Sequence, residues 1–584
     1  MTIEYTLAAS EPRTHRFNVT LRIAEPTTSG QILSLPAWIP GSYLVRDYAR
    51  FVGRVSGRDE RGAVRVTKTS KNRWQCAPAS GALTLEYEIF AWDQSVRGAH
   101  LDDTHGFCNG VNVFLAVAGQ EDQPVRVHLR HPDNIESTWR VATTLPRDGA
   151  QPWQFGAYRA ADYDELIDHP IEMGEFTVVD TDVADVPHRV VLCGRHYCDE
   201  DRLARDVKRI CEEHVALFGE LPAMDEYLFL TRVLGQGYGG LEHRSSTALV
   251  CSRDQLPSDD ADTNARYQSF LGLVSHEYFH TWNVKRIKPA VFTPYALDAE
   301  SYTELLWVFE GITSYYDDLA LVRSGAIRID DYWRLLGAMT TRVLSAPGHQ
   351  EQTLAESSFD TWIKFYKPTP DTANAVVSYY AKGALIALAL DLTLRDRTNG
   401  KVSLDDVMRA LWSRYGATGN GVPEDGFEAL CEHVSGLELT AFFDQAIRST
   451  EMVPLAPLLQ TCGVDVSSSQ GDGPSVSLGV VFEPDSARLR SVRRGSAAEK
   501  AGLAPGDELI ALNGLKVVPA SLSSALAAYK PGQTFDAHLF RDDELMVRPV
   551  TLDAAPETTW RFAANDDATA AQRARRAEWL HRDA

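Results

Sequence analysis

Two histidines four residues apart, with a glutamate directly after the first, occur in the apolar and aromatic segment SHEYFHTWNVKRI, residues 275–287. The preceding FLGLVS continues the apolar pattern, which predicts a helix through His276 and His280. On a helix, residues four apart lie about 40° apart around the axis and about 6 Å along it, so both imidazoles project from one face. Two imidazoles placed in this way can share a tetrahedral metal ion. The segment therefore predicts a metal-binding helix.

A third ligand is expected from a helix downstream, because a catalytic zinc site takes three protein ligands and leaves one position for water. Glu310 lies between large apolar side chains of a predicted helix. An ionised carboxylate buried there costs several kcal/mol unless a cation compensates it, and zinc supplies that cation. A buried salt bridge is the alternative for Glu310. Glu304 is expected either at the surface or in contact with the metal ligands rather than with the metal, and Glu300 is expected in a connecting loop. The sequence predicts one Zn²⁺ per chain, held by His276, His280 and Glu310.

The patterning along the chain predicts a multidomain α+β protein, because 584 residues exceed what one core supports. Strand-like alternation comes first, helical periodicity follows, and strand patterning then returns. DEYLFLTRVL and STALVCS are expected to be short strands flanking a glycine-rich turn, and TCGVDVSSSQGDGPSVS a linker or loose turn. The expected domains are an antiparallel, sandwich-like β-domain at 1–175, a mostly helical domain at 176–465, a small β-domain at 466–556 and a helical tail at 557–584.

Charge and cysteine usage limit the partners and the compartment. The chain has 58 Lys and Arg against 80 Asp and Glu, and this net charge of −22 argues against nucleic-acid or anionic-membrane partners. We find no secretory signal at the N-terminus and no apolar run long enough for a spanning helix. The eight cysteines form no CxxC pair, which favours free thiols. We therefore expect a cytoplasmic protein; a periplasmic location stays open if an export signal has been removed, and so does the oligomeric state.

Three short motifs together resemble those of zinc aminopeptidases. HExxH followed 30 residues after His280 by Glu310, in the context W-x-x-E-G-x-x-x-Y, resembles the gluzincin clan, whose catalytic domain is thermolysin-like. YAKG at residues 380–383 is similar to the Y-x-K-G of the M1 aminopeptidases, whose tyrosine hydroxyl steadies the oxyanion. GGLEH at residues 239–243 resembles their G-x-M-E-N motif, with Leu for Met and His for Asn. The glutamate of that motif receives the free α-amine of the substrate.

The chain as a whole resembles the M61 family, the glycyl aminopeptidase type with a carboxy-terminal PDZ domain. The resemblance covers roughly residues 1–555 and includes PAWIPGSYLVRDYARF, LDDTHGFCNGVNVFL and SHEYFHTWNVKRIKP. It implies a zinc aminopeptidase that acts on peptides or proteins with a free N-terminus and prefers small first residues such as Gly or Ala. The gluzincin clan also contains an epoxide hydrolase, so these motifs do not by themselves prove peptide substrates.

The resemblance also assigns roles to individual residues. Glu277 is expected to be the general base, and Tyr380 the hydrogen-bond donor to the oxyanion. Glu242 is expected to bind the substrate amine, next to Gly239 and Gly240 in the same motif. As alternatives, Tyr380 could be a core aromatic and Glu242 a residue on a strand edge. A PDZ-regulated zinc endopeptidase and a non-catalytic peptide-binding scaffold are the other candidate functions.

The C-terminal run RRGSAAEKAGLAPGDELIALNG, residues 493–514, resembles the centre of a PDZ domain. AEKAGL is expected to be a short helix, DELIALNG a strand, and SLSSALAAY a second helix that lines a groove. Leu478, Gly479 and Val480 would form the loop whose backbone N–H groups hold the carboxylate of a peptide's C-terminus. The alternative is a domain that packs against the catalytic part and binds nothing.

Overall fold

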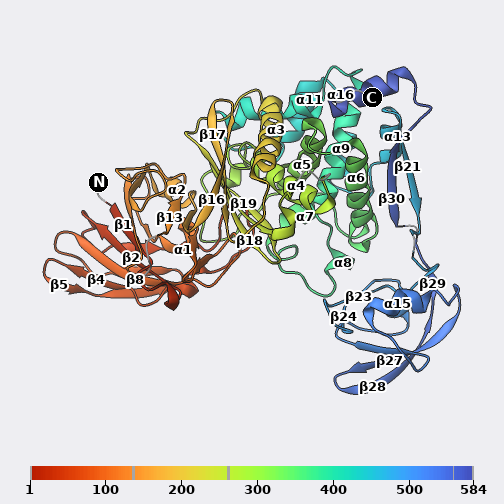
Figure 1. Ribbon diagram of the computed structural model, residues 1–584, viewed down its shortest axis with the longest axis horizontal. Helices are drawn as coiled ribbons and strands as arrows, with labels where there is room; N and C mark the ends of the chain where they lie inside the picture. The colour runs from red at the N-terminus through yellow and green to blue at the C-terminus, as the bar shows by residue number, and fades with distance from the viewer. Residues whose placement is uncertain (1–2, 134–137, 259–262, 472, 557, 582–584) are drawn as a thin grey trace. The chain divides into compact units, whose positions relative to one another are not determined.

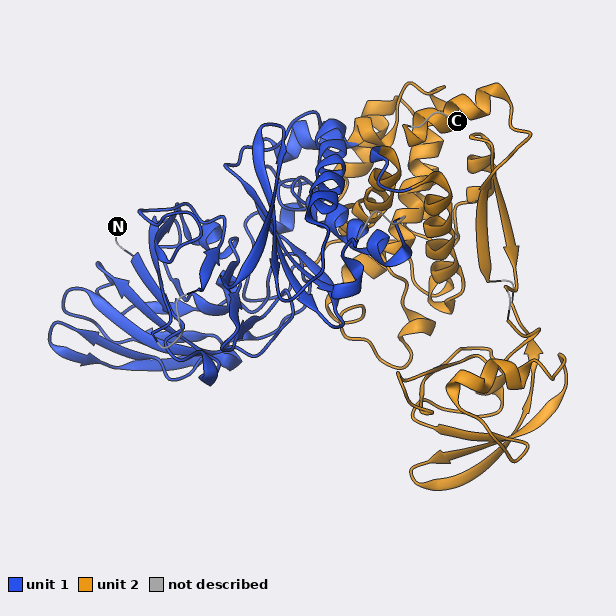
Figure 2. Cartoon of the chain, in the orientation of Figure 1, with its two compact units in different colours: residues 1–301, 324–327, 408–423 blue, residues 302–323, 328–407, 424–584 orange. Residues whose placement is uncertain are grey.

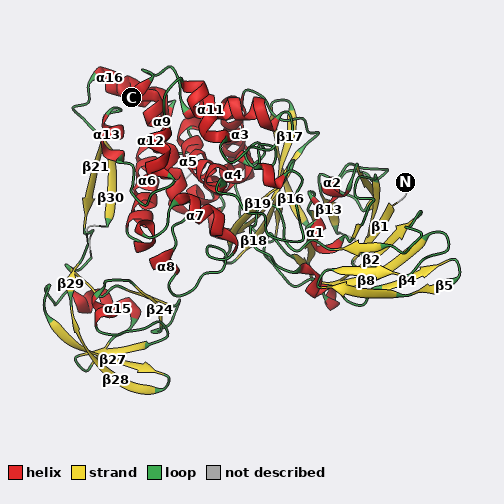
Figure 3. Cartoon of the chain, turned by 180° about the vertical axis from the view of Figure 1, so that it is seen from behind, coloured by secondary structure: helices red, strands yellow, loops and turns green. Residues whose placement is uncertain are grey.

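The computed structural model describes residues 3–133, 138–258, 263–471, 473–556 and 558–581 (Figure 1). The chain divides into two compact units. Unit 1 contains residues 1–301, 324–327 and 408–423, and unit 2 contains residues 302–323, 328–407 and 424–584 (Figure 2). The boundary between them falls inside the segment 176–465, which the sequence pattern predicts as one domain. Strands form most of the N-terminal part of unit 1, and helices form much of unit 2 (Figure 3).

Three sheets form the N-terminal part of unit 1. The largest has the order β14 (Gly156–Ala160), β12 (Val125–Arg130), β1 (Ile3–Ala8), β2 (Arg16–Ile23), β8 (Leu83–Phe90), β4 (Ser56–Asp59) and β5 (Gly62–Val64). The second has the order β13 (Arg140–Ala142), β15 (Ile171–Gly174), β10 (His105–Cys108) and β9 (Ala99–Leu101). The third has the order β11 (Ala116–Val117), β3 (Ile32–Ser34), β7 (Arg73–Cys76) and β6 (Val66–Ser70).

The apolar and polar residues that alternate in the sequence, and so predict these strands, are alternately buried and more exposed in the structure. Every second residue of β1 is buried, and β2 and β8 follow the same pattern, so each strand gives one apolar face to a common core. The predicted antiparallel domain is correct except for one pair, because β1 and β12 run parallel. The long connection between these two strands allows β12 to return beside the first strand in the same direction.

A five-stranded sheet follows in unit 1, with the order β16 (Phe176–Val183), β17 (Val186–Cys193), β18 (Tyr227–Leu234), β20 (Ser246–Ser252) and β19 (Tyr238–Glu242). The two predicted strands are β18 and β20, which lie parallel. The glycine-rich segment between them, predicted to be a turn, forms the edge strand β19. Glycine has a low strand propensity, so the pairing with β20, which no local pattern reveals, decides its structure. Helices α3 (Glu200–Phe218) and α4 (Ala265–Phe279) contact this sheet.

Unit 2 is built mainly from helices. Its main helical elements are the π-helical turn η5 (Trp307–Gly311), α5 (Ile312–Ser324), α6 (Ile329–Leu344), α7 (Leu354–Phe359), α8 (Thr372–Ala375), α9 (Ala381–Arg397), α11 (Gly426–Ser435) and α13 (Leu455–Gln460). Helix α9 is buried without interruption from Ala381 to Leu392, so other parts of the protein surround it on all sides. Within the described residues, no helix has the length and apolar character needed to cross a membrane.

The segment predicted to be a linker is partly a strand. β21 (Val464–Ser469) pairs antiparallel with β30 (Thr559–Ala564), which lies in the tail predicted to be helical. The predicted helix of that tail is α16 (Ala570–Leu580). Serines 467–469 give β21 little apolar character, so the strand depends on a partner about 95 residues away in the sequence, and the local pattern could not reveal it.

The small C-terminal domain has a core of its own. Its sheet has the order β26 (Leu515–Lys516), β25 (Glu508–Leu512), β27 (Thr534–Arg541) and β28 (Glu544–Thr551), and a separate pair is formed by β23 (Val480–Phe482) and β24 (Leu489–Val492). Helix α14 (Ala497–Lys500) begins one residue before the predicted AEKAGL helix and covers its first three residues, and α15 (Pro519–Leu526) covers most of the second predicted helix. The assignment of these elements to a PDZ domain stays a prediction.

Candidate metal centre

The helix predicted from HExxH is α4. Its N-terminus is capped by Asn264, whose side-chain oxygen accepts hydrogen bonds from the backbone N–H groups of Arg266 and Tyr267. His276 lies in the last turn, and His280 is the C-terminal cap with helical dihedral angles. The ring centroids of His276 and His280 are 4.7 Å apart, with an angle of 87° between the ring planes. The two imidazoles therefore lie on one face of the helix, as the spacing predicts.

A backbone carbonyl sets the orientation of His280. Its Nδ1 lies 2.6 Å from the carbonyl oxygen of Asn283, which can only accept a hydrogen bond. Nδ1 of His280 must therefore carry the proton, so Nε2 is the nitrogen of the neutral ring that can act as a ligand. Metal-binding histidines commonly donate their second ring N–H in this way. The sequence pattern does not reveal this contact, because it depends on the turn that follows the helix.

Glu277 lies against a glycine of the edge strand β19. Glu277 is 5% exposed, and a Cβ built on Gly240 would lie only 2.0 Å from its Oε1 atom. Such a distance does not occur in real structures, so position 240 accepts only glycine unless the carboxylate moves. Arg97 donates from Nη2 to the carbonyl oxygen of Gly240, with 3.4 Å between the atoms. Gly239, by contrast, has no atom closer than 3.9 Å to its Cβ position.

Glu242 ends the strand β19 and is also held against a glycine. It is 3% exposed, and a Cβ built on Gly41 would lie 2.3 Å from its Oε2 atom. Gly41 has a φ of +93°, a conformation that favours glycine. Oε1 of Glu242 is buried and has no hydrogen-bond partner among the described residues. The carboxylate is therefore enclosed by backbone but incompletely satisfied.

Glu310 lies in the π-helical turn η5 and is 2% exposed. π-helical turns occur frequently at functional sites. The turn is fixed on one side by Ser358, whose Oγ accepts a hydrogen bond from the backbone N–H of Trp307 at 3.1 Å. On another side it contacts α9: a Cβ on Gly311 would lie 2.6 Å from the Cα of Gly383. Thus the turn that carries Glu310 packs backbone to backbone against α9.

Tyr380 is the N-terminal cap of α9 and is half-buried. Its hydroxyl oxygen lies 3.0 Å from that of Tyr366. Its ring stacks on Phe365, with 5.7 Å between centroids and 25° between the planes. These contacts fix the ring and leave it accessible, unlike the neighbouring Tyr379, which is 0% exposed. Tyr380 is therefore not a fully buried core aromatic.

Three groups of described side chains bring potential ligand atoms within 4.8 Å of one another. One of them is the predicted set His276, His280 and Glu310. A second consists of Glu242, Glu277 and His280. Two histidines with a carboxylate form a ligand set that suits zinc, and the tautomer of His280 presents the required nitrogen. The residues present therefore fit a zinc ion, and they also place two buried carboxylates close together.

A cluster of buried charges lies next to the motif that carries Glu242. Asp168 is 8% exposed and forms ion pairs with Lys285 at 2.6 Å and with Arg244 at 3.8 Å. Burial opposes ionisation of Asp168, but Lys285 and Arg244 lower its pKa well below the usual value. His243 lies 3.6 Å from the same carboxylate, so it faces Asp168, as expected of a packed histidine rather than a ligand. Sequence reasoning missed Asp168, which has no motif of its own.

Comparisons with known proteins agree with these motifs. The model of the Peptidase M61 N-terminal domain matches residues 4–175, and that of the M61 glycyl aminopeptidase matches residues 269–386. No curated protein matches the chain. Among solved structures, an aminopeptidase N family protein from Idiomarina loihiensis is 39% identical with a TM-score of 0.95, and the match covers 99% of this chain and 100% of that one. An M1 zinc metallopeptidase from Deinococcus radiodurans is 15% identical with a TM-score of 0.47, and the match covers 77% of this chain and 94% of that one.

Proposed function

Because the chain belongs to the M61 family of peptidases, we propose that it is a zinc-dependent aminopeptidase, which hydrolyses the first peptide bond of a substrate with a free N-terminus. The observation that carries this proposal is the pair of buried carboxylates, Glu242 and Glu277, beside a metal-type histidine, His280. Hydrolysis at a zinc site needs one carboxylate as a base. A second buried carboxylate at the site, Glu242, is explained if it binds a positively charged group of the substrate.

His276, His280 and Glu310 would hold the zinc ion. Bound there, zinc supplies an activated water molecule and polarises the carbonyl group of the scissile bond. Support comes from the two imidazoles on one face of α4 and from the burial of Glu310 in an apolar turn. A nearby cation stabilises an ionised carboxylate at 2% exposure, and a bound zinc ion would supply that charge.

Glu277 is the proposed general base. It takes the proton from the attacking water and passes it to the amine that leaves. Its position next to Gly240 supports this role, because the carboxylate cannot move toward the strand without meeting backbone. Tyr380 is proposed to donate a hydrogen bond to the oxyanion, which is the carbonyl oxygen after attack on the carbonyl carbon. The partial exposure of Tyr380 and the stacking of its ring on Phe365 support that role.

Glu242 is proposed to bind the α-ammonium group of the substrate. Its Oε1 atom is buried and lacks a hydrogen-bond partner among the described residues, so it has capacity for a donor. An ammonium group brings both the donor and the positive charge that a carboxylate at 3% exposure needs. Binding of the amine at this point limits cleavage to the first peptide bond. Gly239 and Gly240 would flank the same substrate group.

The preference for Gly or Ala as the first residue is supported by the description of the matching family, glycyl aminopeptidase. The test is the rate of hydrolysis of a panel of aminoacyl amides beside their N-acetylated counterparts, with and without a chelator. We expect hydrolysis of the free-amine substrates, with Gly and Ala fastest, and loss of activity with the chelator. Equal cleavage of acetylated peptides would favour an endopeptidase, and zinc-free protein without activity would favour a peptide-binding scaffold.

We also propose that the small C-terminal domain binds the carboxyl terminus of a peptide through Leu478, Gly479 and Val480. Gly479 has a φ of +79°, and a Cβ there would lie 2.2 Å from the Cβ of Ser496, so the chain turns sharply at this loop. Strand β23, which begins at Val480, pairs with β24 alone in the described part of the chain, so its other edge can accept a peptide strand. Fluorescence anisotropy with peptides that end in a free carboxylate or an amide tests this, and equal binding of both forms contradicts it.

A further inference from the structure

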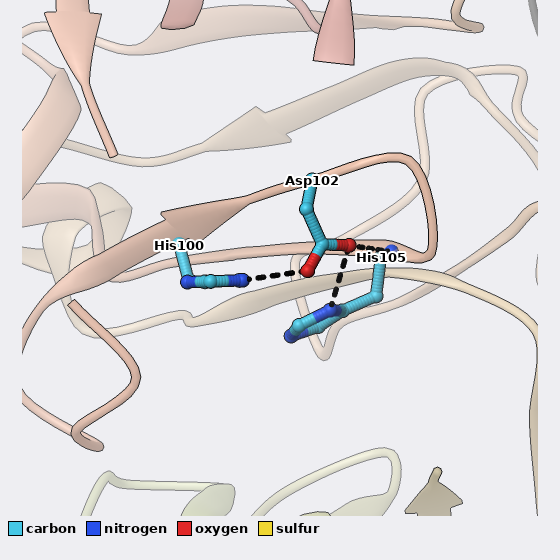
Figure 4. Close-up of side chains that lie close together, drawn as sticks. All are labelled: His100, Asp102 and His105. Atoms are coloured by element: carbon cyan, nitrogen blue, oxygen red, sulfur yellow. Dashed lines mark hydrogen bonds and ion pairs between the residues drawn. The ribbon is translucent and has the colours of Figure 1, made fainter. Parts of the chain in front are cut away.

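A second cluster of metal-type side chains lies in the β9–β10 hairpin, outside the proposed zinc centre. His100 lies in β9, Asp102 directly follows that strand, and His105 begins β10. The close-up in Figure 4 shows both rings directed at the carboxylate between them. Potential ligand atoms of the three residues lie within 4.8 Å of one another. His100 and His105 are 1% and 2% exposed, so the two imidazoles are held away from solvent.

The distances in this cluster are those of ligands around one ion. Nε2 of His100 lies 3.0 Å from Oδ2 of Asp102, and Nδ1 of His105 lies 3.6 Å from Oδ1. Two ligand atoms on a tetrahedral zinc ion, with bonds of about 2.1 Å, lie about 3.4 Å apart. The observed separations lie on either side of this value. The separation of each ring nitrogen from its nearer oxygen of Asp102 is therefore compatible with ligands of one zinc ion.

The carboxylate of Asp102 is anchored through one oxygen. Oδ1 accepts hydrogen bonds from the backbone N–H and the hydroxyl of Thr104, at 2.7 and 2.6 Å, and from the backbone N–H of His105 at 3.1 Å. Oδ2 has one partner among the described residues, Nε2 of His100 at 3.0 Å. Carboxylates that bind metal ions are typically held in this way by hydrogen bonds to the second oxygen. The turn therefore orients Asp102 and leaves Oδ2 for a cation.

His100 lines a small cavity of about 20 Å³, which has room for one water molecule. His105, Glu172 and Arg232 also line this cavity. Nδ1 of His100, Oε1 of Glu172 and Nε of Arg232 are buried and have no hydrogen-bond partner within the described residues. A water molecule between them could accept a proton from Nδ1 of His100. That tautomer leaves Nε2 unprotonated and facing Oδ2 of Asp102, an arrangement that a cation stabilises.

We propose that the β9–β10 hairpin binds one divalent transition-metal ion through Nε2 of His100, the carboxylate of Asp102 and Nδ1 of His105. Two imidazoles with one carboxylate suit Zn²⁺ rather than Ca²⁺ or Mg²⁺, which prefer oxygen ligands. The ion ties the two strands together at the turn of the hairpin and neutralises the half-buried carboxylate. It is additional to the proposed catalytic ion, so the chain binds two zinc ions instead of one.

The experiment is the zinc content of the full chain, purified in the presence of zinc and measured by inductively coupled plasma mass spectrometry. We expect two ions per chain in the wild type, one in His276→Ala/His280→Ala, one in His100→Ala/His105→Ala, and none when all four histidines are replaced. The double variant of His276 and His280 separates this proposal from the proposed function, because the hairpin ion must remain when the other is lost. The matched control His128→Ala/His131→Ala removes two other histidines of unit 1 and should keep both ions.

A variant that keeps the hydrogen bonds of the turn tests the proposal even if the histidine variants do not fold. Asp102→Asn retains an oxygen for the N–H groups of Thr104 and His105 but loses the charge. In the His276→Ala/His280→Ala background it should weaken zinc binding at least 10-fold in competition with a chromogenic chelator. Loading the same background with Co²⁺ should give visible absorption bands that Asp102→Asn removes. Folded His276→Ala/His280→Ala protein without any zinc, or a remaining ion insensitive to Asp102→Asn, overturns the proposal and leaves a hydrogen-bonded His–Asp–His cluster.

Discussion

Replacement of Gly240 by alanine should remove activity without weakening the fold. A Cβ at this position would lie 2.0 Å from Oε1 of Glu277, whereas real Cβ atoms essentially never come closer than 3.0 Å to another atom. The carboxylate must therefore move by at least about 1 Å. It is the end of a flexible side chain, so this movement costs little folding energy. For a general base, however, a misplacement of about 1 Å is expected to lower kcat/KM about 100-fold.

Gly239→Ala is the matched control, because the nearest atom to its Cβ position is 3.9 Å away. Both variants should be assayed on glycyl and alanyl amides, with zinc content and thermal unfolding measured in parallel. We expect Gly240→Ala to keep its zinc and its melting temperature within a few degrees while kcat/KM falls, and Gly239→Ala to stay within about threefold of the wild type. Equal activity of the two variants would refute the reasoning that β19 fixes Glu277.

Four further predictions concern single side chains. Glu277→Gln should keep zinc but lower turnover by about 10²- to 10⁴-fold, and near-normal turnover would remove Glu277 as the base. Glu242→Gln should lower kcat/KM on free-amine substrates by about 10- to 150-fold, which corresponds to the loss of about 1.5–3 kcal/mol from a hydrogen bond to a charged group. Unchanged kinetics would contradict the binding of the substrate amine by Glu242. Tyr380→Phe should lower kcat by about 10²- to 10³-fold, whereas Tyr366→Phe should cost much less; equal losses would exclude a direct role of the Tyr380 hydroxyl. Burial lowers the pKa of Lys382 to about 8 from 10.5, so its charge destabilises the fold most below pH 8 and not at all above pH 10.5. Lys382→Met should therefore raise the free energy of unfolding at pH 7 by up to about 3 kcal/mol, as measured by denaturant titration. This gain should shrink between pH 8 and pH 10.5, and its absence would contradict the lowered pKa.

The metal-type residues could be predicted from the sequence because helical spacing is a local property. The i, i+4 pair His276 and His280 required only a helix, and the structure provides α4. The apolar surroundings of Glu310 in the sequence predict its burial, which the structure shows, whereas its role as a metal ligand stays a prediction. In both cases, the neighbouring residues in the chain carry the information.

The features that the sequence did not reveal depend on partners far away along the chain. β19 looked like a turn because two of its five residues are glycines, and its pairing with β20 decides its structure. The same holds for β21, which needs β30. Gly41 approaches Glu242 from a loop about 200 residues earlier, and no periodicity within either segment reveals that contact.

The close contact between Gly311 and Gly383 has a mechanical consequence. No side chain lies between the two backbones, since a Cβ on either glycine would lie less than 3 Å from the other residue. Rotation of side chains therefore cannot absorb a displacement of one helix against the other. Glu310 precedes the first glycine by one residue and Tyr380 precedes the second by three, so these two residues must shift together. If they have the roles proposed above, a substitution that tilts α9 would disturb metal binding and stabilisation of the oxyanion as a single event.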